Sequence, residues 1–415
     1  MLSNPVPFRH PERSRVRSAG LPARGRSRCR AALAALATGA TLMLHGAFCA
    51  AQAPATSAPE PPALDAPPRV FQAPPLAPPI REAPAAQALP ATPPGPPGPP
   101  IALVLPLSSP DYARAAEAVR DGFLAAAAAA GAKERVRVIA HAQDGVLEAF
   151  DDAAAGGARV VVGPLVRDDL KALATADRDV PVTIALNQLD DAAPLPPRVY
   201  TFALAIESDA RTIARRMRDD GATSVAVIGG DTPLMRRFAH AFVGEWILAG
   251  GNLPQSFPFV PTQDGLRALR RDLARATVDT IVIAVDGPDA ALVKTFAPRV
   301  TAWASGQVNQ RQDAAAIRDL EDVRFVDVSW IVAPGAAEFA RLPRPEFASY
   351  ALDRLYALGV DAYRVAEAFV EAPPDRLAFD GATGHVELSD ARQIAREGRL
   401  ATFRAGAVVP LDGGR

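Results

Sequence analysis

The sequence predicts an α/β protein of two doubly wound lobes, preceded by a signal segment and a disordered proline-rich linker. Three observations carry this prediction: solid apolar runs alternate with amphipathic stretches from Ile101 onward, the alternation starts over near residue 205, and the first 100 residues show neither pattern. Solid apolar runs are typical of parallel strands that helices cover on both faces. Two such series in tandem form two lobes, which normally enclose a cleft.

The first lobe begins with the apolar strand 101–105, which Pro106 ends. Apolar residues then recur at helical spacing until Gly131 ends the helix. The stripe consists of Tyr112, Ala116, Val119 and Phe123. Four further apolar runs are predicted strands: Val136–Ala140, Val160–Val162, Val182–Leu186 and Val199–Phe202. We therefore expect the first lobe to span residues 101–204, with a return segment at about 331–385.

The second lobe, expected over residues 205–330, opens with two helices. Thr232-Pro233 caps the second of these helices and Gly250-Gly251 ends it. The apolar stripes are Ile206, Ala210, Ile213 and Met217 on the first helix, and Met235, Phe238, Phe242 and Trp246 on the second. The predicted strands are Ser224–Ile228, Thr280–Val285 and Val323–Val328. A long helix is expected over Tyr350–Phe369, with Leu352, Leu355, Tyr363 and Ala366 facing inward. The lobe to which residues 386–415 belong stays open.

The N-terminal 51 residues have the order of a signal peptide. Residues 9–30 are rich in arginine and almost free of acids, and residues 31–51 are apolar apart from threonines and His45. The apolar run is about as long as the ~20 residues that span a bilayer, so an uncleaved anchor competes with cleavage after Ala51. In both cases the arginines stay inside and the rest of the chain is exported.

Both cysteines of the chain, Cys29 and Cys49, lie in this segment. Disulfides, zinc sites and cysteine nucleophiles are therefore excluded from the folded part. Cys49 is a candidate lipidation site, but lipidation requires small residues just before the cysteine, and Phe48 breaks that pattern. The alternative is a cysteine of a signal peptide without a role of its own.

Residues 52–100 form a predicted linker. They hold 18 of the chain's 41 prolines, few charges and no sustained apolar periodicity. A polyproline-like segment of this length reaches on the order of 150 Å when fully extended. A small soluble receptor does not need such a tether.

Composition and motifs exclude several classes of protein. The formal net charge of −1 argues against a nucleic-acid partner. The chain contains no G-x-S-x-G elbow, phosphate-binding loop, dinucleotide-binding turn or H-E-x-x-H helix. The histidines of the folded part are His141, His240 and His385, which lack metal-ligand spacing. We therefore predict no catalytic residue, no cofactor and no metal site.

Paired aspartates recur at four places, but adjacent side chains point in different directions and do not form an acid/base pair. The pairs are Asp151-Asp152, Asp168-Asp169, Asp190-Asp191 and Asp219-Asp220. Asp168-Asp169 follows Gly163-Pro164 where a helix is predicted to begin, and carboxylates are favourable at a helix N-terminus. All four pairs are expected to have structural roles.

The loops that follow the first-lobe strands hold the candidate ligand-binding residues, because ligands in open α/β sheets gather at the carboxyl ends of strands. The candidates are Ser108, Ser109, Asn187 and Gln188, which could hydrogen-bond a small polar ligand in the cleft. Equally, these residue types cap helices and turn the chain.

Five short strings of the chain are distinctive when taken together: Ile101–Ser108, Val162–Leu165, Ala185–Asp190, Arg354–Ala362 and Phe379–Gly384. They resemble the LppC/LpoA family, the lipoprotein activators of class A penicillin-binding proteins, and the resemblance runs over residues 101–411. The resemblance implies a type I periplasmic-binding-protein fold. It also implies a protein without catalysis of its own, which contacts and stimulates a peptidoglycan synthase. Two departures are the proline-rich linker, which stands where well-studied members carry a helical-repeat domain, and Phe48 before the lipidation cysteine.

Two functional hypotheses follow. The first is a non-catalytic periplasmic regulator that binds and activates a class A penicillin-binding protein, with peptidoglycan as a second candidate partner. Membrane attachment is expected only through the N-terminus, by a lipid in the outer membrane or by an uncleaved signal in the inner membrane. The alternative is a periplasmic solute-binding receptor for a small polar ligand such as an amino acid. The linker favours the regulator, because a diffusing receptor gains nothing evident from it.

Overall fold

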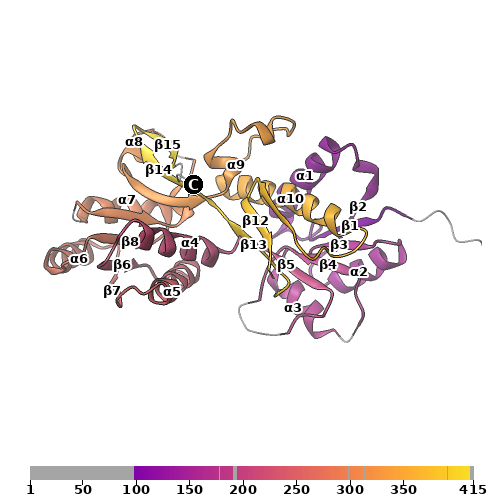
Figure 1. Ribbon diagram of the computed structural model, residues 1–415, viewed down its shortest axis with the longest axis horizontal. Helices are drawn as coiled ribbons and strands as arrows, with labels where there is room; N and C mark the ends of the chain where they lie inside the picture. Colours follow the sequence, from indigo (N-terminus) through magenta and orange to yellow (C-terminus); the bar gives the residue numbers. More distant parts are fainter. Residues whose placement is uncertain are drawn as a thin grey trace, which may run out of the picture. The chain divides into compact units, whose positions relative to one another are not determined.

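The computed structural model describes residues 98–176, 178–189, 194–297, 299–311, 314–389 and 391–411, all within one unit of the chain, Gln87–Arg415 (Figure 1). Several predictions concern residues outside these ranges. They are the signal segment or anchor over residues 1–51, lipidation at Cys49, the linker up to residue 97 and the pair Asp190-Asp191.

The first sheet of the described chain has the strand order β11-β12-β13-β5-β4-β3-β1-β2. Its strands are β1 (Ile101–Leu105), β2 (Val136–Ala140), β3 (Val160–Val162), β4 (Val182–Ala185), β5 (Val199–Phe202), β11 (Ala378–Gly381), β12 (Gly384–Leu388) and β13 (Gln393–Glu397). Strands β1 to β5 pair in parallel, and β13 extends that parallel part through β5. Strands β11, β12 and β13 form an antiparallel edge.

Helices cover both faces of the first sheet. They are α1 (Ala113–Ala129), α2 (Val146–Ala155), α3 (Arg167–Thr175) and α10 (Tyr350–Phe369), with the short η1 (Lys133–Arg135). Helices α1 and α10 share one hydrophobic cluster with inward residues of β1, β3 and β4, whereas α2 and α3 pack against the opposite face. This two-sided burial is the physical reason that β1 and β3 are apolar throughout.

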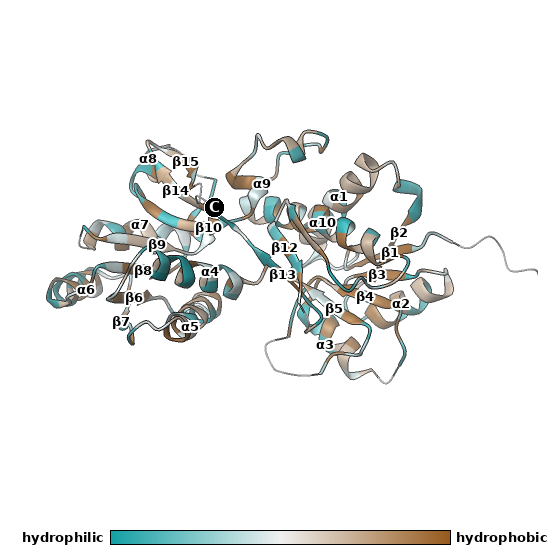
Figure 2. Cartoon of the chain, in the orientation of Figure 1, coloured by the Kyte–Doolittle hydropathy of each residue, from teal (hydrophilic) through white to brown (hydrophobic). Residues whose placement is uncertain are grey.

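The second sheet has the order β15-β14-β10-β9-β8-β6-β7. Its strands are β6 (Val225–Gly229), β7 (Gln255–Pro258), β8 (Thr280–Ala284), β9 (Thr301–Ala304), β10 (Val323–Asp327), β14 (Arg399–Arg404) and β15 (Ala407–Pro410). Its helices are α4 (Ile206–Asp219), α5 (Pro233–Leu248), α6 (Gln263–Arg275), α7 (Gly287–Phe296), η2 (Gly306–Val308) and α8 (Ala314–Arg318). The short helices α9 (Ser329–Val332) and η3 (Ala337–Phe339) follow β10 and place Trp330 and Phe339 in the core of the first sheet. Helices α4 and α5 cover one face, and α6 and α7 the other. Figure 2 shows the contrast between hydrophobic inner strands such as β3 and β4 and the largely hydrophilic α4.

The predicted fold class is confirmed: two parallel-dominated sheets, each with helices on both faces, form an α/β architecture. Strands β1, β2, β3 and β5 and helix α10 have the predicted bounds. Sequence patterns missed β7, which is largely exposed, β9, and the hairpin strands β11 to β15. Hairpin strands at a sheet edge alternate in burial, so they lack a solid apolar run.

The burial of α10 differs in part from the prediction. Tyr363 and Ala366 face inward as expected, but Leu352 and Leu355 are only half-buried. The helix also buries charged residues, Asp353, Arg354 and Asp361, because it packs between α1, the sheet and the second lobe. An amphipathic pattern assumes one apolar face and therefore misses a helix surrounded on most sides.

The C-terminal segment left open by the sequence contributes to both sheets. Strands β12 and β13 extend the first sheet, and β14 and β15 extend the second, with Gly398 between them. The lobe boundaries drawn at residues 204 and 330 stay predictions. The chain passes from one sheet to the other after β5, after β10 and after β13.

Two glycines allow α1 and α10 to approach closely. A Cβ atom at Gly359 would overlap the carbonyl oxygen of Val119, and one at Gly122 would overlap the carbonyl oxygen of Tyr356. We expect Gly359→Ala to lower the free energy of unfolding by about 1–3 kcal/mol, because the added methyl forces the helices apart. Urea unfolding of the full chain measures this change.

Gly244 in α5 provides the matched control, because it is exposed and no heavy atom lies within 4 Å of its Cβ position. Gly244→Ala should raise stability by up to about 1 kcal/mol, since alanine favours a helix over glycine. A Gly359→Ala protein as stable as the wild type would contradict the close approach of the two helices.

Candidate functional site

A pocket of about 430 Å³ lies where the loops after β3, β4 and β5 meet residues of the second lobe. Its lining includes Leu165, Arg167, Asp168, Leu186, Asn187, Gln188, Leu204, Leu355 and Leu358, together with Glu207 of α4 and Arg237 of α5. The volume falls in the range of small-molecule sites, about 300–1,000 Å³. The pocket lies at the carboxyl ends of the parallel strands, where ligands of open α/β sheets gather.

Two of the predicted ligand-binding residues, Asn187 and Gln188, line this pocket. The Asn187 side chain donates from Nδ2 to the Leu165 carbonyl at 2.9 Å, and its Oδ1 accepts from the Gln188 backbone N–H at 2.9 Å. The Asn187 amide therefore ties the loop after β4 to the loop after β3. Gln188 is half-buried and lines the pocket.

The other two predicted residues, Ser108 and Ser109, are not among the residues that line the pocket. Ser108 is exposed, and its backbone N–H donates to the His141 carbonyl. Ser109 is buried, and its carbonyl accepts from the N–H groups of Tyr112 and Ala113 where α1 begins. These contacts turn the chain into the helix, while ligand binding by the serines stays a prediction.

Of the charged residues of the pocket, sequence patterns singled out Asp168, for a structural role, but not Arg167, Glu207 or Arg237. The Glu207 Oε1 atom lies 2.8 Å from Nε of Arg237, and both side chains belong to second-lobe helices. Arg167 and Asp168 lie at the start of α3. An acidic first turn on α4 was visible in the sequence, but only the tertiary structure places it beside first-lobe loops.

The pair Asp168-Asp169 lies in the first turn of α3, as predicted. Asp169 also lies near a histidine, since its Oδ2 atom is 3.9 Å from Nε2 of the buried His141. Burial raises the pKa of the Asp169 carboxyl, and His141 opposes this rise. The two residues bring the loops after β2 and β3 into contact.

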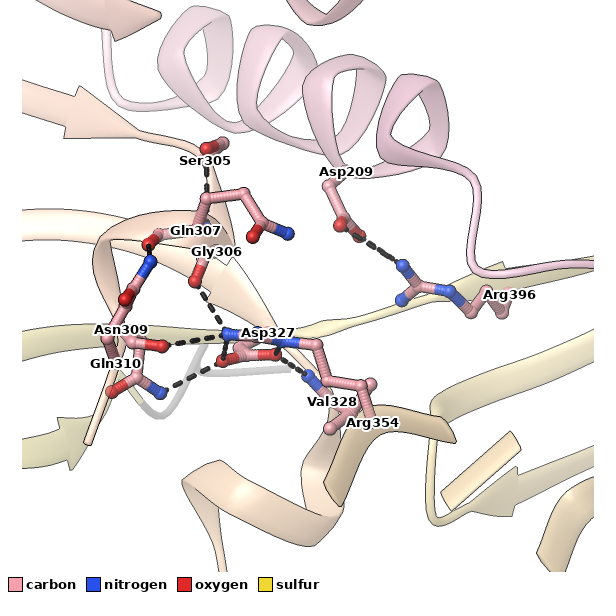
Figure 3. Close-up of polar contacts among 10 residues, drawn as sticks. All are labelled: Asp209, Ser305, Gly306, Gln307, Asn309, Gln310, Asp327, Val328, Arg354 and Arg396. Atoms are coloured by element: carbon pink, nitrogen blue, oxygen red, sulfur yellow. Dashed lines mark hydrogen bonds and ion pairs between the residues drawn. The ribbon is translucent and has the colours of Figure 1, made fainter. Parts of the chain in front are cut away.

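Beside the pocket, a buried charge pair connects the two lobes (Figure 3). Arg354 of α10 donates from Nε and Nη2 to the two carboxylate oxygens of Asp327 at the end of β10, each at 2.8 Å. Nη2 of Arg354 also donates to the carbonyls of Gly306 and Asn309 at 2.7 and 2.9 Å. Arg354 and Asp327 are 9% and 3% exposed, so this bidentate pair is almost completely removed from water.

Other groups complete the surroundings of the Asp327 carboxylate. The Asn309 Nδ2 donates to it at 2.9 Å, and the backbone N–H of Val328 donates at 2.8 Å. Four donors therefore face one carboxylate, which is how a buried charge becomes tolerable. A charged residue at the carboxyl end of a buried strand was a signal in the sequence that could have pointed to this site.

A second buried pair joins Arg396 of β13 to Asp209 of α4, with Nη2 of Arg396 3.0 Å from Oδ1 and 3.1 Å from Oδ2. Burial raises the pKa of the Asp209 carboxyl, and the Arg396 charge opposes this rise. Among the described residues, Nε and Nη1 of Arg396 have no hydrogen-bond partner, so this pair is less complete than the Arg354 pair. A third pair, Arg311 and Asp353 at 2.8 Å, is partly exposed. We refer to the three pairs together as the inter-lobe lock.

No group of three or more histidines, cysteines or acids in the described part of the chain is arranged to hold a metal ion. No helix within the described ranges is long and apolar enough to cross a membrane.

The family described as "LppC putative lipoprotein" matches residues 97–256 and 263–406. The chain belongs to the LppC family. The match covers both lobes and confirms the resemblance seen in the five sequence strings.

Curated LppC relatives are named penicillin-binding protein activator LpoA. The protein of Edwardsiella ictaluri is 25% identical over 308 residues, which cover 64% of this chain and 45% of that protein. The protein of Haemophilus influenzae is 24% identical over 297 residues, which cover 66% and 49%. The chain thus spans about half the length of the curated relatives it matches. These relatives are named activators rather than enzymes.

Two solved structures share the fold over nearly their whole length. The LpoA C-domain of Haemophilus influenzae, described as a regulator of PBP1A, has a TM-score of 0.65 at 22% identity, covering 75% of this chain and 99% of that one. A "putative branched-chain amino acid ABC transporter" of Chromobacterium violaceum has a TM-score of 0.65 at 31% identity, covering 73% and 99%. The type I periplasmic-binding fold is therefore confirmed.

The structure explains two of the strings that carry the family resemblance. Asp361, in the string Arg354–Ala362, is fully buried and accepts from the backbone N–H groups of Ala382 and Thr383 at 2.9 and 2.6 Å. The Thr383 hydroxyl donates to the same carboxylate at 2.6 Å. Burial raises the pKa of Asp361, and the Thr383 donors oppose this rise. The string Phe379–Gly384 is therefore the hairpin turn that this carboxylate holds.

Proposed function

We propose that this chain is a non-catalytic regulator in the cell envelope that binds a class A penicillin-binding protein and stimulates peptidoglycan synthesis. The observation that carries the proposal is the inter-lobe lock in a member of a family whose curated relatives are named activators of such proteins. A receptor that closes on a solute needs lobes that separate. A protein that acts by docking gains from lobes held in one arrangement, since less freedom is then lost on binding.

The lock makes separation of the lobes costly. Opening the lobes would expose Arg354 and Asp327 to water but would also break the contacts to Gly306 and Asn309. The arrangement supports a rigid two-lobed body that presents its outer surface to a partner.

The N-terminal segment fits this role. An exported chain with 49 proline-rich residues before the folded part can reach on the order of 150 Å from its point of attachment. In the proposal, either a lipid on Cys49 or an uncleaved signal supplies that attachment. Such reach would let a membrane-attached regulator meet a synthase across the peptidoglycan layer.

A second candidate is a solute-binding receptor, which the pocket of about 430 Å³ supports. The C. violaceum structure, described as a "putative branched-chain amino acid ABC transporter", is 31% identical. In this chain a charged ligand would have to compete with the pair between Glu207 and Arg237 in the pocket. That competition is why the receptor ranks second.

One experiment separates the two functions. The full chain is added to a purified class A penicillin-binding protein, and the rates of glycan polymerisation and peptide cross-linking are measured. The regulator predicts a rate increase of several-fold that saturates with concentration. Heat-denatured chain and an unrelated solute-binding protein are the controls.

The same preparation is heated with each amino acid at millimolar concentration. A receptor whose ligand is present at 100 times the Kd would gain about 2.7 kcal/mol of stability, which raises its Tm by several degrees. Suppose that an amino acid raises Tm, that Arg237→Met abolishes this rise, and that the chain does not stimulate the synthase. The regulator hypothesis would then be rejected in favour of the receptor. Stimulation without a Tm rise would support the regulator.

A further inference from the structure

A groove on the second lobe lies at the amino ends of β8, β9 and β10. Asp327 of the inter-lobe lock lies at the other end of β10, its carboxyl end. The groove consists of two adjoining depressions of about 570 and 400 Å³, both bordered by Thr301, Arg324 and Leu411. The larger depression extends along the end of α4 to Asp220, and the smaller one extends to Lys294, Arg299 and Arg404. We call the two together the basal groove.

The strand register explains why this part of the sheet is polar. Arg324 of β10 lies opposite Trp303 in β9 and opposite Thr402 in β14, so these side chains share one face of the sheet. Helices α4 and α5 cover Trp303 on that face. Beyond the end of α4 the same face carries Thr301, Arg324 and Arg404 in place of apolar residues. Helix α4 therefore ends before this strip of the sheet and leaves it uncovered.

The smaller depression is positively charged. Lys294, Arg299 and Arg404 surround it, against a single acidic side chain, Asp322. In the described part of the chain no ion pair involves any of these three cations. The fourth cation, Arg324, is held 2.9 Å from Asp220 and lies over the Trp303 ring at 5.4 Å. Three cationic residues from three segments thus border the smaller depression, and within the described ranges none of them forms an ion pair.

We propose that the basal groove binds the carboxylates of peptidoglycan stem peptides. Guanidinium groups match carboxylates in a two-bonded geometry, and the separation of the cations on different segments favours a ligand with several carboxylates. Peptidoglycan carries such groups along its length and is the polymer beside which an envelope protein works. The inference rests on the envelope location in the proposed function, but it does not require contact with a synthase.

The test is co-sedimentation of the full chain with purified peptidoglycan sacculi at moderate salt. The double variant Arg299→Glu/Arg404→Glu should weaken binding at least tenfold, since it replaces two attractive charges by two repulsive ones. Its matched control is Arg270→Glu/Arg271→Glu on α6, which makes the same change of charge on two exposed residues of the same lobe. The control should change binding less than twofold.

Each outcome decides the assignment. If both variants weaken binding to sacculi equally, then binding reflects general charge attraction and the proposed site in the basal groove is wrong. Competition by inorganic phosphate or anionic phospholipid vesicles, but not by soluble muropeptides, would assign the groove to phosphate groups instead. Loss of binding when residues 412–415 are removed, with the groove intact, would also overturn the proposal. Synthase stimulation is measured in parallel, so failure of the groove and failure of the regulator are distinguished.

Discussion

Replacing Arg354 by methionine should lower the free energy of unfolding by about 3–5 kcal/mol, because the Asp327 carboxylate would stay buried without its counter-charge. The carbonyls of Gly306 and Asn309 would also lose their donor. Methionine keeps much of the volume, so the loss reports on charge and hydrogen bonding rather than on a cavity. Urea unfolding of the full chain measures the change.

Arg376→Met is the matched control, because Arg376 is exposed and takes part in none of the inter-lobe pairs. Its effect should stay within about 0.5 kcal/mol, as is usual for exposed positions. Arg354→Lys should have an intermediate effect, since lysine keeps the charge but cannot form the bidentate contact. An Arg354→Met protein as stable as this control would show that the pair contributes nothing to stability.

The same variant also tests whether the pair fixes the two lobes. Spin labels can be attached at Lys133→Cys and Ser256→Cys, two exposed positions on different lobes, after Cys29 and Cys49 are changed to serine. The wild type should show one narrow distribution of distances between the labels, and Arg354→Met a broader one. If the distance distributions of the two proteins are equally wide, then the Arg354 pair does not hold the two lobes in one arrangement.

Asp361→Ala is expected to have a comparable effect, a loss of about 3–5 kcal/mol. The substitution leaves the buried N–H groups of Ala382 and Thr383 without an acceptor, and each unsatisfied buried donor costs about 1–3 kcal/mol. It also removes the carboxylate against which Gly381 packs, so a cavity adds to the loss. The midpoint of urea unfolding measures the change.

Asp375→Ala, at an exposed position before β11, is the control and should be nearly neutral. Asp361→Asn retains one acceptor oxygen and should therefore lose less stability than Asp361→Ala. If Asp361→Ala unfolds at the wild-type midpoint, then the turn over Phe379–Gly384 does not depend on this carboxylate. The structural explanation of both family strings would then be wrong.

The candidate pocket shows how far sequence patterns reach. Asn187 and Gln188 could be placed in it because the carboxyl end of a predicted parallel strand is a definite location. The same reasoning placed Ser108 and Ser109 there, but the chain turns into α1 at once and their backbone groups are used in that turn. Glu207 and Arg237 could not be placed, because their position depends on how the second lobe packs against the first.

By itself the sequence determined the fold class and most first-lobe elements, because buried parallel strands and amphipathic helices have periodicities that are local. The family was indicated separately, by the resemblance of five short strings to LppC/LpoA. It also determined that the folded part contains no cysteine. Only the tertiary structure decided that Arg354 meets Asp327, that Arg396 meets Asp209, and that the β13–β14 segment serves both sheets. These contacts join residues far apart in the chain, and a charged side chain in a helix pattern does not indicate its partner.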